Sequence, residues 1–413
     1  MEDEDSGNVP GSGRGGILLL CSLWALVIMK TLSEEKSYRF ADFIRFVAMC
    51  AIIFQHSFIV EKEILLADYP SVILFFFLKV IAKIGSISFF VVSGFLLSSA
   101  LERYSSRDYL NKRVKNIFKP YILFIFFYLI LDSIGAFFGQ QKIASLTELP
   151  AFVASKILGI LFFTSYWFIF NYFISVMILL AFRKYLYEQW FGILLLSFTA
   201  AYAINVHFEW LTPHHTTAFV GFTFFLWLGA NLKKHDQLFW KLVETIPYWK
   251  LIAIVLITLS ANLYETFYLM QTGATVVDSS LKFTNILYAL SVFLLLSKMG
   301  SSITFGFLNP RDETYPLYLI HPIFLKVINY AILPMLPAVS RLITIDNPSE
   351  VGWLTILVYQ IGWFLAVYMI SLVAVKIILY SPLRWVFGKQ GKVVVSPIQS
   401  FRLLINEVRN FKI

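Results

Sequence analysis

The sequence predicts an all-α fold, a polytopic transmembrane helical bundle of about ten core spans. Of its 413 residues, 58% are hydrophobic and only 14% are charged, and the mean hydropathy is +0.73. Ordinary soluble domains carry about 25% charged residues, so this chain lacks the polar surface that water requires. Apolar runs recur along most of the chain, and many have the roughly 20-residue length that crosses a bilayer. The predicted surroundings of the protein are therefore a lipid bilayer.

Ten apolar segments satisfy this criterion. We expect spans at 41–60, 77–100, 118–138, 166–182, 191–206, 216–232, 250–268, 283–299, 315–336 and 352–380. A shorter run at 152–164 either lies at the membrane interface or belongs to the fourth span. The sequence shows no internal repeat and no long soluble insertion, so we expect one membrane domain over residues 38–380.

Basic residues are concentrated in every second connecting segment, and this pattern predicts the orientation. Segment 101–119 carries six lysines and arginines, whereas segment 206–215 carries none. Because basic loops remain in the cytoplasm, we expect both ends of the ten-span core there, together with a basic tail at 381–413. This arrangement accounts for the net charge of +9 without a nucleic-acid partner.

Residues 1–37 are predicted to be a separate leader. An acidic, glycine-rich start precedes a short apolar run at 17–29. The run is short for a span, and it lacks the basic start and the small-residue cleavage site of a signal peptide. An eleventh helix, an interfacial segment and an upstream extension all remain open. The two cysteines, Cys21 and Cys50, lie in apolar runs and form no metal or redox motif.

The first span contains three ionisable residues, Asp42, Arg45 and His56, where charge is costly and usually functional. Arg45 and His56 are eleven residues apart, so they share one helix face about 16 Å apart along the axis. Histidine can act as a general base or carry an acyl group, and arginine can bind a phosphate with two parallel hydrogen bonds. Alternatively, Arg45 extends to the interface and His56 makes a structural hydrogen bond.

Other polar residues in apolar segments give weaker signals. His321 follows Tyr318 in the ninth span and could relay protons, although a structural hydrogen bond explains it equally well. Trp167 begins an aromatic stretch that is either a ligand wall or an interfacial belt. Lys79 and Lys83 share a helix face and are expected to reach towards the interface.

One predicted outer loop is rich in possible metal ligands. Its members are His207, Glu209, His214 and His215. The loop has no pair of histidines at helical spacing, and Pro213 interrupts it. We therefore expect a solvated loop and no metal site.

Five segments, in order over residues 38–325, resemble acyltransferase family 3 of membrane O-acyltransferases. YRFADFIRFVAMCAIIFQHSF is similar to the opening helix of the family, whose arginine and histidine match Arg45 and His56. SISFFVVSGFLLSS resembles the second-span pattern and contains Ser93 and Gly94. YLNKRVKNIFKPY, SYWFIFNYF and YPLYLIHPIF resemble later segments. In the basic loop the chain departs from the usual pair of arginines, because Asn116 follows Arg113 three residues later.

The resemblance implies O-acyl transfer from cytoplasmic acyl-CoA, with acetyl-CoA as the expected donor, to a carbohydrate hydroxyl at a bacterial inner membrane. It implies that His56 is the catalytic base or acyl relay and that Arg45 positions it or contacts the donor phosphate. Four cations would draw in the donor: Arg39, Lys112, Arg113 and Lys115. Six residues would support the pocket: Asp42, Ser93, Gly94, Trp167, Tyr318 and His321. Gly94 and Ser93 would let the second helix approach the first. No permanently bound cofactor or metal is expected.

Two other functions fit parts of the sequence. A secondary transporter or flippase for a lipid-linked sugar would have similar composition, although the paired broken helices typical of transporters are missing from the sequence. A non-catalytic membrane scaffold would leave Arg45 and His56 without a purpose. Donor dependence distinguishes these readings, because an acyltransferase needs acyl-CoA and a flippase does not change the mass of its substrate.

Overall fold

The computed structural model describes residues 39–58, 69–138, 149–303, 305, 308–328 and 353–389. All regular structure within these residues is helical, which confirms the all-α fold class. The leader at 1–37, with its apolar run and Cys21, lies outside the described residues, and so does the tail beyond 389.

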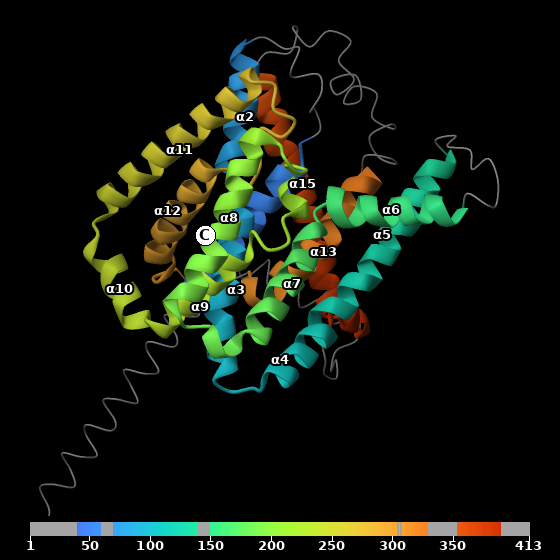
Figure 1. The fold of residues 1–413 in the computed structure, drawn as a ribbon. Coiled ribbons are helices and arrows are strands. Elements are labelled where there is room, and N and C mark those ends of the chain that lie inside the picture. Colours follow the sequence, from blue (N-terminus) through green and yellow to red (C-terminus); the bar gives the residue numbers. More distant parts are fainter. Residues whose placement is uncertain are drawn as a thin grey trace, which may run out of the picture.

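The ten predicted segments are helical over most of their described length. In chain order the helices are residues 39–56, α2 (Tyr69–Ile81), α3 (Gly85–Leu101), α4 (Ser106–Arg113), a π-helix (Val114–Phe118), α5 (Lys119–Phe138), α6 (Leu149–Phe163), α7 (Trp167–Ala181), α8 (Gln189–Phe208), α9 (Thr223–Lys234), α10 (Asp236–Thr245), α11 (Tyr248–Gln271), α12 (Phe283–Gly300), α13 (Pro310–Val327) and α15 (Trp353–Leu379). They form a bundle from which α6 and the end of α5 project to one side (Figure 1).

The predicted count of ten spans is not confirmed. Among the described residues, six helical stretches are long and apolar enough to cross a membrane, or seven if α6 and α7 together form one bent span. The difference has physical causes. The first helix, residues 39–56, carries three charged side chains in its 18 residues, and α7 and α9 are only 15 and 12 residues long. Helix α13 begins with the acidic residues Asp312 and Glu313 and contains Pro316 and Pro322 in its interior.

The short apolar run before the fourth span forms α6, which is bent by 76° relative to α7. Three tyrosine hydroxyls hold this corner. Tyr121 donates to the Tyr166 carbonyl at 3.0 Å, and Tyr318 donates to the Ser165 carbonyl. Tyr166 in turn donates to the Leu319 carbonyl at 2.7 Å. The corner is thereby attached to α13 through bonds in both directions.

Helices α3 and α9 cross with their backbones in contact (Figure 1). A Cβ atom on Gly94 would lie 1.9 Å from the Leu226 carbonyl oxygen, and one on Gly229 would lie 1.9 Å from the Val91 carbonyl oxygen. The expectation that Gly94 packs against the first helix is therefore wrong, because its partner is α9. The sequence reveals that a small residue permits close approach, but it does not reveal which helix approaches.

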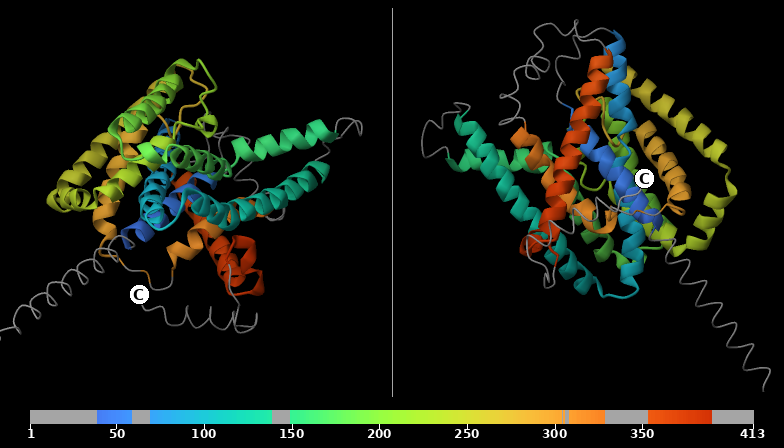
Figure 2. Two further views of the ribbon diagram at one scale, coloured as in Figure 1. Left: turned by 60° about the horizontal axis from the view of Figure 1, so that its bottom comes forward. Right: turned by 180° about the vertical axis from the view of Figure 1, so that it is seen from behind.

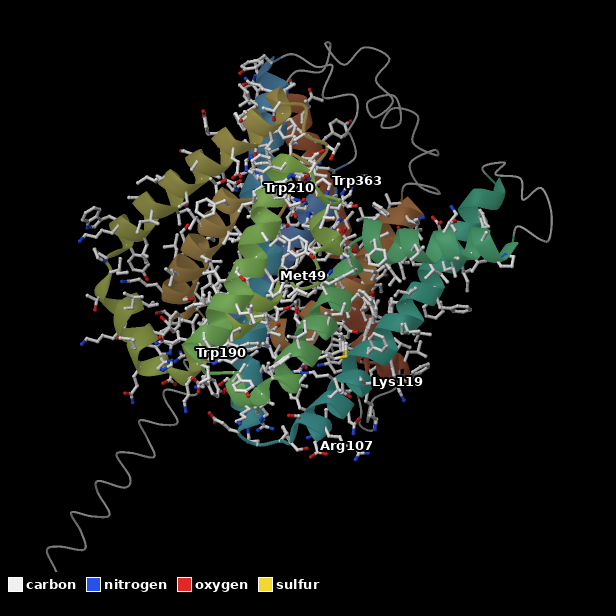
Figure 3. The ribbon with its side chains drawn as sticks, viewed as in Figure 1. Met49, Arg107, Lys119, Trp190, Trp210 and Trp363 are labelled. Carbon is white, nitrogen blue, oxygen red and sulfur yellow. The ribbon has the colours of Figure 1, made fainter. Side chains whose placement is uncertain are left out.

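The first helix runs through the middle of the bundle, as the view from behind shows (Figure 2). Phe40, Ile44 and Ile53 are fully buried on it. At the lower end of the bundle lie Arg107 of α4 and Lys119 of α5, whereas Trp210 and Trp363 lie towards the upper end (Figure 3). Two residues of the strongly basic segment 101–119 thus lie at one end of the bundle.

Candidate active site

Arg45 and His56 lie near opposite ends of the first helix. Arg45 forms an ion pair with Asp42 one turn earlier, with 2.6 Å between guanidinium nitrogen and carboxylate oxygen. This bond fixes the orientation of the guanidinium. Each residue lines a different cavity.

Arg45 lines a cavity of about 330 Å³, here called the basic cavity. Three more cations line it: Arg113, Arg311 and Lys389. Lys389 is paired with Asp312, and Arg113 donates from Nε to the Tyr109 hydroxyl at 2.8 Å. Four cationic side chains around one cavity attract a polyanionic ligand.

Of the four cations predicted to contact the donor, one lines this cavity. Arg113 does, but Lys112 instead lies over the Tyr104 ring, with its Nζ 3.4 Å from the ring centroid. Arg39 and Lys115 do not line it. A helix exposes successive residues on different faces, so neighbours in a basic segment separate once the helix packs.

Sequence reasoning missed a wall of the basic cavity that comes from the segment after α15. Phe387, Gly388 and Lys389 line the cavity beside the π-helix residue Asn116. Gly388 has a positive φ of 71°, and a Cβ atom there would overlap the Asn116 backbone. A glycine followed by lysine in a basic tail was the available signal, but the sequence does not show that this tail folds back onto the third span.

His56 lines a second cavity of about 310 Å³, here called the histidine cavity. Lys79 and Lys83 line it as well, with Nζ atoms 3.8 Å and 3.2 Å from an oxygen of Asp278. Both lysines thus form ion pairs with one carboxylate. Burial raises the pKa of Asp278, but the nearby Lys83 and Lys79 lower it by a larger amount. Its pKa therefore lies below the usual range, and the carboxylate is charged.

The predicted outer loop of possible metal ligands is divided by the fold. His207 belongs to α8, and its Nε2 lies 2.8 Å from the Glu265 carboxylate. His214 and His215 line the histidine cavity, where the Trp167 ring lies 5.1 Å from the His215 ring. Burial lowers the pKa of His215 to about 3, so this histidine is neutral. The loop is therefore not simply solvated, and the described residues contain no group of three metal ligands.

His321 lies beside His56, with 5.8 Å between ring centroids. It is fully buried, and its Nδ1 is 3.0 Å from the Leu317 carbonyl. Because a carbonyl accepts, Nδ1 must carry the proton in this bond, which leaves Nε2 as an acceptor. Nε2 has no hydrogen-bond partner within the described part of the chain. His56 thus has a second histidine beside it, whose ring orientation is fixed by the bond to Leu317.

A third cavity of about 330 Å³, here called the side cavity, also contains His56. It lies between α5, the α6–α7 corner and α13, and it shares Thr164 and Ser165 with the histidine cavity. Lys326 lines it and is paired with Asp132. His56 therefore lies where two cavities meet.

Phe168 and Tyr318 line both the basic cavity and the histidine cavity. Their ring centroids are 5.8 Å apart, with an angle of 58° between the ring planes. A single layer of side chains therefore separates the cationic end of the site from His56. The two cavities thus lie on either side of Phe168 and Tyr318.

Residues 38–358 match a family model described as an acyltransferase domain. The chain belongs to acyltransferase family 3. No curated protein and no solved structure matches it. The family match confirms the resemblance seen in the sequence and identifies the protein as a membrane acyltransferase. Arg45 and His56 lie inside the matched region, whereas the wall made by Phe387–Lys389 lies beyond it.

Proposed function

We propose that this acyltransferase moves an acetyl or other short acyl group from cytoplasmic acyl-CoA to a hydroxyl of a cell-surface or lipid-linked glycan, at a bacterial inner membrane. The observation that carries the proposal is that one helix presents Arg45 to a cationic cavity and His56 to a polar one, across one layer of side chains.

The basic cavity suits the phosphates of coenzyme A. Arg113 and Arg311 can each bind a phosphate through two parallel hydrogen bonds, which a lysine cannot do. Arg45, oriented by Asp42, lines the same cavity and would contact the donor as well. The basic segments at this end of the bundle support a cytoplasmic location, because loops rich in lysine and arginine remain on that side.

The histidine cavity suits the hydroxyl acceptor. His56 accepts the proton of the hydroxyl while the oxygen attacks the thioester carbonyl. The carbon–sulfur bond breaks, the ester carbon–oxygen bond forms, and the proton passes from His56 to the sulfur of coenzyme A. Polar side chains such as Gln55, Ser86 and Thr164 line the same cavity and offer hydrogen bonds to a sugar.

Mass spectrometry of surface glycans tests the proposal in cells that carry the intact gene, a deletion or His56→Ala. We expect an acyl-sized mass increment with the intact gene and its loss in both other strains. His235→Ala is the matched control, because the His235 side chain is exposed, hydrogen-bonds to the Asn231 carbonyl one turn earlier and lines none of the three cavities. This control should keep the increment.

Full acylation by the His56→Ala protein would refute the proposed mechanism. Unchanged glycan masses combined with glycans retained inside the cell would instead support the transporter or flippase. Release of free coenzyme A by the purified protein provides the independent check, because a flippase leaves acyl-CoA intact.

A further inference from the structure

The wall between the basic and histidine cavities lies where a bound donor must pass. Arg45 and His56 are about 16 Å apart along their helix. A donor whose phosphates lie in the basic cavity must therefore extend its thioester towards Phe168 and Tyr318 before it reaches His56. Both aromatic side chains are buried, with 8% and 4% of their surface exposed.

The two aromatic residues are held differently. The Tyr318 hydroxyl donates to the Ser165 carbonyl at the α6–α7 corner, so this ring is fixed by a hydrogen bond. Phe168 is held by ring packing, with centroids 4.9 Å from Phe90 and 5.8 Å from Phe89. A phenylalanine held by packing can change rotamer without losing a hydrogen bond. Phe168 is thus the shared lining residue that can move without breaking a hydrogen bond of its side chain.

We propose that Phe168 and Tyr318 form an aromatic gate between donor and acceptor cavities, and that Phe168 restricts the transferred group to short acyl chains. The inference rests on the proposed function. Phe168 also lines the histidine cavity, so its ring limits the space left for the acyl chain once the thioester reaches His56. While no acceptor is bound, the closed ring keeps the thioester on the donor side and away from water in the histidine cavity, so that transfer prevails over hydrolysis.

Removal of the ring has two chemical consequences. The enlarged opening admits longer acyl chains to transfer. It also lets water attack the thioester, which breaks the carbon–sulfur bond and yields a free carboxylic acid and coenzyme A, with the proton of water passing to the sulfur. This side reaction needs no glycan acceptor and can be followed alone.

The test measures release of coenzyme A thiol by the purified full chain in lipid nanodiscs, with acetyl-CoA and hexanoyl-CoA as donors, and glycan ester masses in cells. Phe168→Ala should raise the ratio of kcat/KM for hexanoyl-CoA over acetyl-CoA by at least about tenfold, since a tight apolar pocket distinguishes single methylenes by roughly that factor. It should also raise thiol release without acceptor. Phe168→Leu should change both in the same direction and by less.

Phe170→Ala is the control on the same helix, because Phe170 packs against Phe162 and Phe219 and lines none of the three cavities. It should leave both quantities unchanged. Unchanged donor preference in Phe168→Leu and Phe168→Ala, or an equal change in Phe170→Ala, would overturn the gate. If the alanine protein does not fold, the leucine protein decides. Acylation that persists in His56→Ala would instead refute the proposed function, so the two failures are distinguishable.

Discussion

Replacement of Gly94 by alanine should destabilise the bundle by about 1–3 kcal/mol, the usual cost of overpacking a close-packed site. The added Cβ atom would lie 1.9 Å from the Leu226 carbonyl oxygen, where ordinary contact begins at 3.4 Å. Helices α3 and α9 would therefore have to separate by about 1.5 Å at this point. A gap of 0.5–1 Å already removes roughly a quarter to a half of the dispersion attraction between atoms, and rigid backbone has no side-chain freedom that could relieve the clash.

Titration of the purified protein with SDS in mixed micelles, followed by tryptophan fluorescence, measures the free energy of unfolding. Gly159→Ala is the matched control, because a Cβ atom there meets no atom within 4 Å. Alanine is favoured over glycine in helices by about 1 kcal/mol, so the control should be neutral or slightly stabilised. Ser93, next to Gly94, lines the basic cavity, so displacement of α3 should also raise the KM for acyl-CoA.

Gly229→Ala should cost a similar amount, since its Cβ atom would approach Val91 on the other side of the same crossing. The double variant should cost less than the sum, because helices that are already separated accommodate the second methyl group. Equal stability of Gly94→Ala and Gly159→Ala would refute the reasoning, and so would strict additivity of the two glycine replacements at the crossing.

Two further predictions concern the cavities. Arg113→Ala should raise the KM for acyl-CoA at least tenfold with a smaller effect on kcat, since a charged hydrogen bond contributes about 1.5–3 kcal/mol. Lys112→Ala should leave the KM within about twofold. Steady-state kinetics with purified protein measure both values, and equal behaviour of the two variants would contradict the prediction. Because Lys83 holds the pKa of Asp278 below its usual range, the carboxylate should stabilise the fold at every pH above about 4 and lose this contribution as the pH falls further. The stability difference between the natural protein and Asp278→Asn should therefore be constant from pH 8 to pH 5 and shrink under acid, and a difference that grows under acid would show the opposite linkage.

Much of the fold follows from local sequence, because hydrocarbon forces the backbone to satisfy its own hydrogen bonds. That constraint makes apolar length a good predictor of helices, and each predicted segment is helical over most of its described length. The number of crossings did not follow in the same way. Helix α9 is short, and α13 has charged residues and two interior prolines, so composition alone does not establish whether they cross.

The sequence by itself determined the family and the two central candidates of the site. Arg45 and His56 were accessible because helical periodicity within one span fixes their common face and separation. Tertiary structure decided everything that depends on contact between distant segments. It joined Lys83 to Asp278, Gly94 to α9, and Lys389 to the basic cavity. Periodicity describes which face of a helix a residue occupies, but the choice of neighbour for that face depends on packing over the whole bundle.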